Sequence, residues 1–320
     1  MGIKRLTGFL ERTLIGAVPP RTLRQGDTLL IDGNGWAWEL LGYDTRVDHG
    51  GDYDALHASV VKEVGNLQAA GLRLLVYKDG PMRQLKQAAK RKRRDQVADA
   101  WVSLHGYCLD GGAGSGTDRG VRGFPPPPLM TDQMYATLAE IGVPIVRCDG
   151  EADAELARAS AQDETGRSFV LGSDSDFLLF KGCRYIKISQ LKVENGTVEA
   201  CIWTRARLAE VCGLSEAQLV EWAILLGNDY TAHIPLNTYS GLAGMGEAFR
   251  RDPDEVLEWV MAQPDDFLLD VNTSQNPDAF QAVAFSRALY DLQPLDQFAP
   301  DEPLDDSYAE EEEDKNDVNG

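Results

Sequence analysis

Short runs of apolar residues alternate along the chain with longer segments in which apolar residues recur every three or four positions. The short runs predict buried strands and the longer segments predict helices. We expect strands at 28–32, 72–77, 143–147, 168–171 and 185–188. We expect helices at 36–41, 53–70, 82–104 and 131–141, from about 151 onward, and at 215–226. This alternation predicts an α/β fold, a mostly parallel twisted sheet with helices on both faces, plus a small C-terminal helical region at 250–294.

Composition excludes several classes of protein. No run of about 18 apolar residues occurs, so no segment is expected to span a membrane. The five cysteines include no CxxC pair, which favours reduced thiols inside a cell over a zinc site or a disulfide framework. Residues 110–128 are rich in Gly and Pro and are expected to form a loop or mobile insert.

The net charge of −20 is unevenly distributed. Residues 301–320 carry −9 and residues 251–300 carry −8, which leaves −3 for residues 1–250. Within residues 73–94, nine Lys and Arg stand against one acid, Asp79. A basic face beside acids suits a metal-dependent phosphodiesterase, because cations attract phosphates and carboxylates bind the metal. A solvated helix face explains such a charge run equally well.

Acidic residues stand at the ends of three predicted strands, at the start of one predicted helix and just after another. Because the carboxyl ends of parallel strands share one edge of a sheet, we expect these side chains to converge there. Seven acids make up the set: Asp32, Asp79, Glu151, Asp153, Asp174, Asp176 and Asp229. Converging carboxylates need cations, and ligands that are all oxygen favour Mg²⁺ or Mn²⁺. Two such ions about 4 Å apart can support in-line phosphodiester cleavage by water; the alternative is that the acids only cap turns and helices.

The segments that carry these acids resemble the motifs of the flap endonuclease/XPG nucleases in order and spacing. They are Met1-Gly2-Ile3, Ile31-Asp32-Gly-Asn, Lys78-Asp79-Gly-Pro81, Glu151-Ala-Asp153-Ala, Ser173-Asp174-Ser-Asp176-Phe and Leu226-Gly-Asn-Asp229-Tyr. The opening Met-Gly-Ile-Lys-x-Leu-Thr looks most like asteroid-type proteins. The resemblance implies a PIN-like XPG-type nuclease domain over residues 1–232, with an arch-like flexible insert at 105–130. A helical region at 233–298 and a disordered acidic tail at 299–320 would follow.

The resemblance also implies individual roles. The first metal cluster of the family is matched by Asp32, Asp79, Glu151 and Asp153. The second cluster is matched by Asp174, Asp176 and Asp229. Lys86 and Arg93 match the cations that stabilise the transition state, and Arg91 or Arg94 would replace Arg93 if the helix register differs.

Nucleic-acid contacts are implied for a further set of residues: Gly2, Trp38, Lys90, Arg91 and Arg94. Trp38 matches an aromatic on which a base stacks, although packing in the core is the interpretation we favour for it. Gly2 could instead form a tight turn. The basic run 90–94 could also be a nuclear localisation signal, which predicts a nuclear protein.

Three functions remain open. The first is a structure-specific DNA endonuclease, with exonuclease activity as an addition, that cleaves branched or overhanging DNA in repair or replication. The second is an RNA-processing nuclease, and the third is a catalytically silent asteroid-type scaffold. Presence of all seven acids favours an enzyme. Gly244-Met-Gly246-Glu-Ala248 lacks the lysine of the family's helix–hairpin–helix, and no sliding-clamp peptide is visible.

Overall fold

A parallel β-sheet forms the centre of the molecule. The computed structural model describes residues 3, 5–13, 16–41, 51–80, 87–109, 127–242, 244–271, 276–295 and 298. The five strands are β2 (Thr28–Asp32), β3 (Arg73–Lys78), β4 (Ile145–Arg147), β5 (Ser168–Gly172) and β6 (Tyr185–Lys187). They run parallel in the order β4-β3-β2-β5-β6, which places β2 at the middle. The predicted α/β fold with a parallel sheet is confirmed.

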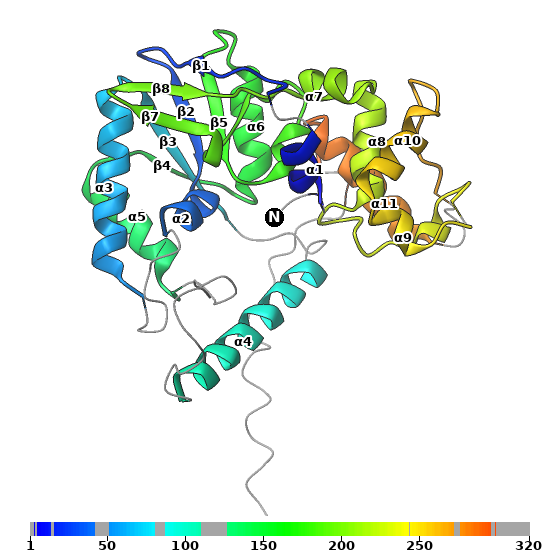
Figure 1. Ribbon diagram of the computed structural model, residues 1–320, viewed down its shortest axis with the longest axis horizontal. Helices are drawn as coiled ribbons and strands as arrows, with labels where there is room; N and C mark the ends of the chain where they lie inside the picture. Colours follow the sequence, from blue (N-terminus) through cyan, green and yellow to red (C-terminus); the bar gives the residue numbers. More distant parts are fainter. Residues whose placement is uncertain are drawn as a thin grey trace, which may run out of the picture.

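Helices cover both faces of this sheet (Figure 1). One face carries α2 (Gly33–Leu41), α3 (Tyr53–Ala69) and α5 (Met130–Glu140). The other core contains α1 (Leu6–Thr13), α6 (Ala152–Gln162), α7 (Arg205–Cys212) and α8 (Glu216–Leu226). Strand β2 serves both cores, because Leu29 and Ile31 join the first and Leu30 joins the second. Side chains alternate between the faces of a strand, so a central strand buried on both sides is apolar throughout.

A second, antiparallel sheet was absent from the sequence-based prediction. It contains β1 (Arg21–Thr22), β7 (Leu191–Glu194) and β8 (Thr197–Ala200) in the order β1-β8-β7. Asn195 and Gly196 connect β7 to β8 with φ angles of 51° and 75°. Two positive φ angles are what a two-residue hairpin turn requires, and Asn-Gly is its strongest sequence signal.

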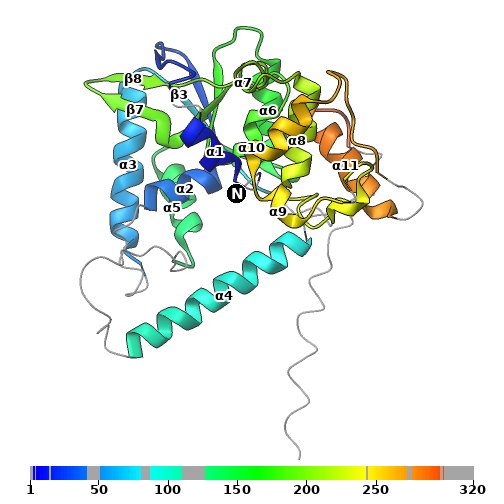
Figure 2. The same ribbon diagram turned by 45° about the vertical axis from the view of Figure 1, so that its right-hand side comes forward.

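The basic helix α4 (Gln87–Leu109) ends five residues beyond its predicted end. The start of the predicted range, 82–86, lies outside the described residues, as do residues 110–126 of the predicted insert. Both views place α4 on the side of the molecule toward which the carboxyl ends of the parallel strands point (Figures 1 and 2). A positively charged helix therefore lies on the same side as the predicted acidic edge.

Three C-terminal helices complete the described fold. They are α9 (Glu247–Arg250), α10 (Pro253–Met261) and α11 (Pro277–Tyr290). Apolar residues of α10 and α11 join the same core as α8, so this region packs directly on the body. The acidic tail predicted at 299–320 lies outside the described residues. Among the helices described, none is long and apolar enough to cross a membrane.

Candidate functional site

Three of the predicted metal ligands lie at the ends of neighbouring strands. Asp32 is the last residue of β2, Asp79 directly follows β3, and Asp174 lies two residues beyond β5. Because β2 pairs with both β3 and β5 in a parallel arrangement, the three carboxylates stand at one edge of the sheet. The charges of Asp79 and Asp174 both act on Asp32, which places the three groups in one electrostatic environment.

Asp32 has a strongly shifted pKa and is only 6% exposed. Burial, together with the negative charges of Asp79 and Asp174, raises the pKa of Asp32 to about 7, against the hydrogen bond that Gly35 N donates at 3.2 Å. A buried carboxyl with acids as neighbours loses its proton only at a cost. A bound cation would offset that cost, and this is the electrostatic condition that a metal site requires.

Asp79 links the sheet edge to the helix that carries the next acids. Its Oδ2 accepts a hydrogen bond from Asn34 Nδ2 at 2.6 Å, and its Oδ1 accepts one from Ala152 N at 2.8 Å. Ala152 is the first residue of α6, between Glu151 and Asp153. The two loops approach closely: a Cβ at Gly80 would stand 2.0 Å from the carbonyl oxygen of Cys148, so only glycine fits there.

Tyr135, on α5, extends this hydrogen-bond network. Its hydroxyl donates to Asn34 Oδ1 at 3.1 Å, and Asn34 in turn donates to Asp79. The sequence analysis identified neither Asn34 nor Tyr135 as a site residue. Asn34 had a local signal, since it follows Asp32 by two residues. Tyr135 had none, because it lies 101 residues from Asn34 and only the fold brings them together.

Three of the four remaining acids line one cavity. Glu151, Asp153 and Asp176 line it, together with Tyr230, and its volume is about 220 Å³. Tyr230 donates its hydroxyl hydrogen to Glu151 Oε2 at 3.0 Å. Asp229 directly precedes Tyr230 in the chain but is not among the residues that line the cavity. The sequence analysis did not name Tyr230 as a site residue, although it is the last residue of the Leu226-Gly-Asn-Asp229-Tyr motif.

Asp174 and Asp176 join the sheet edge to this cavity. Asp174 caps the short helix η3 (Ser175–Leu178), and its Oδ1 accepts a hydrogen bond from Asp176 N at 3.0 Å. Asp176 then lines the cavity. These contacts therefore link Asp79 to the start of α6 and Asp174 to Asp176, and the cavity brings Asp176 together with Glu151 and Asp153.

The acids do not form a closed metal cage. Within the described part of the chain, no three His, Cys, Asp or Glu side chains stand close enough together to hold one ion. Mutual repulsion keeps carboxylates apart, and Asp79, Asp174 and Glu151 each accept hydrogen bonds from protein groups. The donor set still fits a hard divalent cation, since it consists of carboxylate oxygens around the buried Asp32.

Trp38 is exposed, contrary to the favoured expectation that it packs in the core. It is 48% exposed, whereas Trp36 is 2% exposed and belongs to the core under α2. Two positions along a helix correspond to a rotation of about 200°, so the two rings point in opposite directions. The exposed aromatic ring lies on the helix that follows Asp32 directly.

The predicted cationic residues are described only in part. Arg91 and Arg94 are exposed on α4. Lys90 and Arg93 belong to the same helix, but their side chains lie outside the described residues, as do Gly2 and Lys86 entirely. In the segment that replaces the helix–hairpin–helix, Arg250 is buried and donates from Nε to the carbonyl of Leu225 at 2.7 Å. Arg250 thus supports the fold and does not face a phosphate.

Comparison with known proteins finds a family match for part of the chain. Residues 142–229 match the XPG I-region family model. This match confirms the resemblance to the flap endonuclease/XPG superfamily, and it contains five of the seven acids: Glu151, Asp153, Asp174, Asp176 and Asp229.

A curated relative and two solved structures are also similar. The bovine protein named constitutive coactivator of peroxisome proliferator-activated receptor gamma is 30% identical over 202 residues, which cover 63% of this chain and 26% of that protein. The chain thus spans about a quarter of that relative's length. The catalytic core of Rad2 in complex with DNA substrate is 20% identical with a TM-score of 0.49, covering 80% of this chain and 67% of that one. Flap endonuclease-1 from Methanococcus jannaschii is 16% identical with a TM-score of 0.44, covering 88% and 98%.

Proposed function

We propose, on the premise that this chain carries the XPG I-region and the α/β fold of the flap endonuclease/XPG superfamily, that it is a divalent-metal-dependent phosphodiester hydrolase. The observation that carries the proposal is the placement of Asp32, Asp79 and Asp174 at the ends of three adjacent parallel strands. Two buried acids, Asp32 and Asp174, next to a third, the exposed Asp79, are a costly arrangement for a fold alone. They are explained if their task is to bind a cation.

The seven acids would hold two ions, Mg²⁺ or Mn²⁺, in two groups. Asp32, Asp79, Glu151 and Asp153 form the first group, and Asp174, Asp176 and Asp229 form the second. When bound, such ions supply an activated water and a positive charge for the leaving oxygen. The chain itself supplies the geometry: Asn34 and Tyr135 hold Asp79 in place, and Tyr230 holds Glu151.

The substrate we propose is DNA with a branch or an overhang. Arg91 and Arg94 are exposed on α4, on the side toward which the strand ends point, and they can attract the phosphate backbone. Lys86 and Arg93 are proposed to approach the phosphate that is cleaved. Trp38 is proposed to stack on a neighbouring base, an interaction that typically contributes about 1–3 kcal/mol. RNA is the alternative substrate, since nothing in this set of contacts selects the sugar.

Cleavage of labelled flap, overhang and hairpin DNAs and of an RNA panel tests this function. The variant is Asp174→Asn/Asp176→Asn, in which Asn at position 174 can still cap η3. We expect Mg²⁺- or Mn²⁺-dependent cleavage by the unmodified protein and none by the variant. The matched control is Asp252→Asn, which removes a charge from another helix-capping Asp, at the start of α10, and should cleave normally.

Equal cleavage by the Asp174→Asn/Asp176→Asn variant would refute the proposed site. Loss of cleavage in the Asp252→Asn control as well, with both variants shown to be folded by circular dichroism, would also refute it, because the loss would then not be specific to the acids of the sheet edge.

A catalytically silent, asteroid-type scaffold is the second candidate. Two observations favour it: the described acids do not form a closed ion cage, and the bovine relative is named as a coactivator. This function predicts neither cleavage nor binding of Mn²⁺. Calorimetric titration with Mn²⁺ decides between the two, since an enzyme of the proposed type must bind the ion even before substrate arrives.

A further inference from the structure

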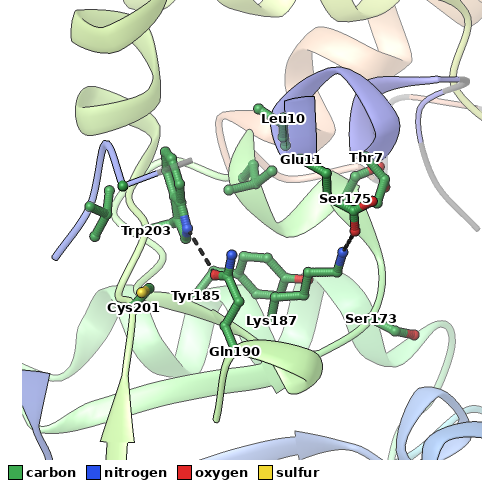
Figure 3. A pocket seen from close by; sticks show the side chains of 13 residues that line it. Thr7, Leu10, Glu11, Ser173, Ser175, Tyr185, Lys187, Gln190, Cys201 and Trp203 are labelled. Carbon is green, nitrogen blue, oxygen red and sulfur yellow. Dashed lines mark hydrogen bonds and ion pairs between the residues drawn. The ribbon is translucent and has the colours of Figure 1, made fainter. Parts of the chain in front are cut away.

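A second cavity, distinct from the one lined by Glu151, Asp153 and Asp176, opens beside the N-terminal helix (Figure 3). Its volume is about 210 Å³, and it lies between α1, the loop at 16–18 and the end of β6. Leu10, Val18 and Leu178 supply apolar walls, and Tyr185 and Trp203 supply aromatic ones. This volume is well above the ~10–15 Å³ that a single water requires by the same measure, so the cavity has room for a small planar molecule.

This cavity adjoins the acidic edge of the sheet. Ser173 and Ser175 both line it, and they flank Asp174 in the chain. The hydroxyl of Ser173 also reaches the acid side, because a Cβ at Gly35 would lie 2.9 Å from Ser173 Oγ and 2.3 Å from Asp32 Oδ2. Burial, followed by the charges of Asp174 and Asp32, raises the pKa of Tyr185 well above its usual value, which also places this ring close to those acids.

Two polar groups give the cavity a chemical preference. Gln190 Oε1 accepts a hydrogen bond from Trp203 Nε1 at 3.2 Å, which fixes the amide against the aromatic wall. An amide presents both donors and an acceptor and so matches the edge of a nucleobase. Lys187 forms an ion pair with Glu11, and that lysine is only one-fifth exposed while the glutamate is well exposed. A phosphate can replace Glu11 as the partner of Lys187, and the charge of the lysine then stays paired.

We propose that this cavity binds a single unpaired nucleobase of the strand that lies on the acidic edge, with Lys187 pairing to a phosphate of that strand. The proposal rests on the proposed function and deepens it, because it gives the enzyme a means to select DNA with an unpaired base near the cut. Aromatic walls accept any base by stacking, and the single amide adds a modest preference among bases.

Abasic scanning tests the proposal through binding alone. A duplex with a single-stranded overhang is labelled with a fluorophore, and one overhang base at a time is removed. Affinities are measured by anisotropy in EDTA, so that no cleavage occurs. We expect one position in the overhang at which removal of the base weakens binding to the unmodified protein by about tenfold, which corresponds to about 1.4 kcal/mol.

Val18→Phe supplies the protein half of a double-mutant cycle, because the larger side chain fills the cavity from its loop wall. The abasic substitution should then cost the variant almost nothing, since the base has already lost its site. Gln190→Ala is a second variant that leaves the volume open and should reduce the abasic effect only in part. An equal abasic effect in the unmodified protein and in Val18→Phe, or no sensitive position at all, overturns the proposal.

Charge variants give an independent test with effects of opposite sign. Lys187→Gln should weaken overhang binding, and Glu11→Gln should strengthen it by releasing Lys187. Glu258→Gln, an exposed acid on α10, controls for the change in net charge. If Glu11→Gln and Glu258→Gln raise affinity equally, Lys187 has no role in binding.

The outcomes separate this inference from the nuclease itself. A protein that cleaves DNA but shows no base-specific effect has the proposed activity and lacks the base site. A protein that shows the effect in EDTA but never cleaves has the base site and lacks the activity.

Discussion

Buried acids in two regions of this protein have opposite surroundings. Where α8 contacts the C-terminal helices, Glu221 is 1% exposed, and Arg287 donates to both of its oxygens at 2.6 and 2.8 Å while Leu269 N donates at 3.1 Å. At the sheet edge, Asp32 is similarly buried, but the charged groups that shift its pKa are Asp79 and Asp174, both acids. One buried acid has its counter-ion within the fold, and the other has acids as its charged neighbours.

This difference separates structural acids from functional ones. In the buried ion pair Glu221–Arg287 the two charges neutralise each other, so the pair joins α8 to α11 without any ion from solution. At Asp32 the neighbouring charges add to the cost of ionisation. Such an arrangement weakens the fold, and the cation that we propose for this edge would supply the missing positive charge.

The largest expected effect on stability comes from breaking the Glu221–Arg287 ion pair. Glu221→Gln leaves Arg287 and Leu269 N without their charged partner and should lower the free energy of unfolding by about 3 kcal/mol or more. Urea denaturation measures this. Glu210→Gln, which removes an exposed partner of Arg207, should cost less than about 1 kcal/mol. Similar losses for both variants would show that Glu221 is no more important than a surface acid.

A divalent cation should produce the next largest effect, and only through the sheet edge. At a hundred times its dissociation constant, Mn²⁺ should stabilise the protein by about 2.7 kcal/mol. Thermal unfolding with and without the ion measures the shift. Asp32→Asn/Asp174→Asn should abolish the shift, whereas Glu210→Gln should retain it. A shift of the same size in the double variant would place the ion elsewhere.

Removal of the charge at Asp32 should stabilise the metal-free protein. The folded-state pKa of about 7 lies above the ordinary value of 3.8, so this carboxyl contributes stability below about pH 4 that is lost as the pH rises to 7. At pH 8 in EDTA, Asp32→Asn should therefore unfold at higher urea concentration, with a gain on the order of 2 kcal/mol. A variant less stable than the unmodified protein at pH 8 would contradict the assigned environment of Asp32.

The smallest effect is expected from the hydrogen bond that supports Asp79. Tyr135→Phe removes the hydroxyl that donates to Asn34 and should cost about 1 kcal/mol of stability. Cleavage should fall through the maximal rate more than through substrate affinity, because Tyr135 positions Asp79 and does not touch the strand. An unchanged rate with weaker binding would assign Tyr135 to substrate contact instead.

The central sheet could be predicted from the amino-acid sequence, because its buried strands are short apolar runs and three of them have an acid at or just beyond their ends. Asp32, Asp79 and Asp174 could be located on the same grounds. The β7–β8 hairpin was missed, although Asn195-Gly196 signals it locally. The contacts of Tyr135 with Asn34 and of Tyr230 with Glu151 join residues 101 and 79 positions apart, and no local pattern encodes such contacts.

The two tryptophans of α2 account for the remaining difference. The first predicted helix began at Trp36, whereas α2 begins at Gly33 and continues directly from β2. Trp36 and Trp38 lie about 200° apart around the helix axis, so only one ring can face the core, and Trp38 is the one that remains exposed. Apolar periodicity alone cannot resolve two tryptophans so close together on so short a helix.

A crystal of the protein soaked in Mn²⁺ tests the central claim most directly, because anomalous scattering locates the ion without any assay of activity. We predict at least one strong anomalous peak bounded by Asp32, Asp79 and Asp174, with these carboxylates drawn toward it. A fully soaked crystal without a peak there, or with peaks only at other surfaces, would contradict a metal site at the sheet edge.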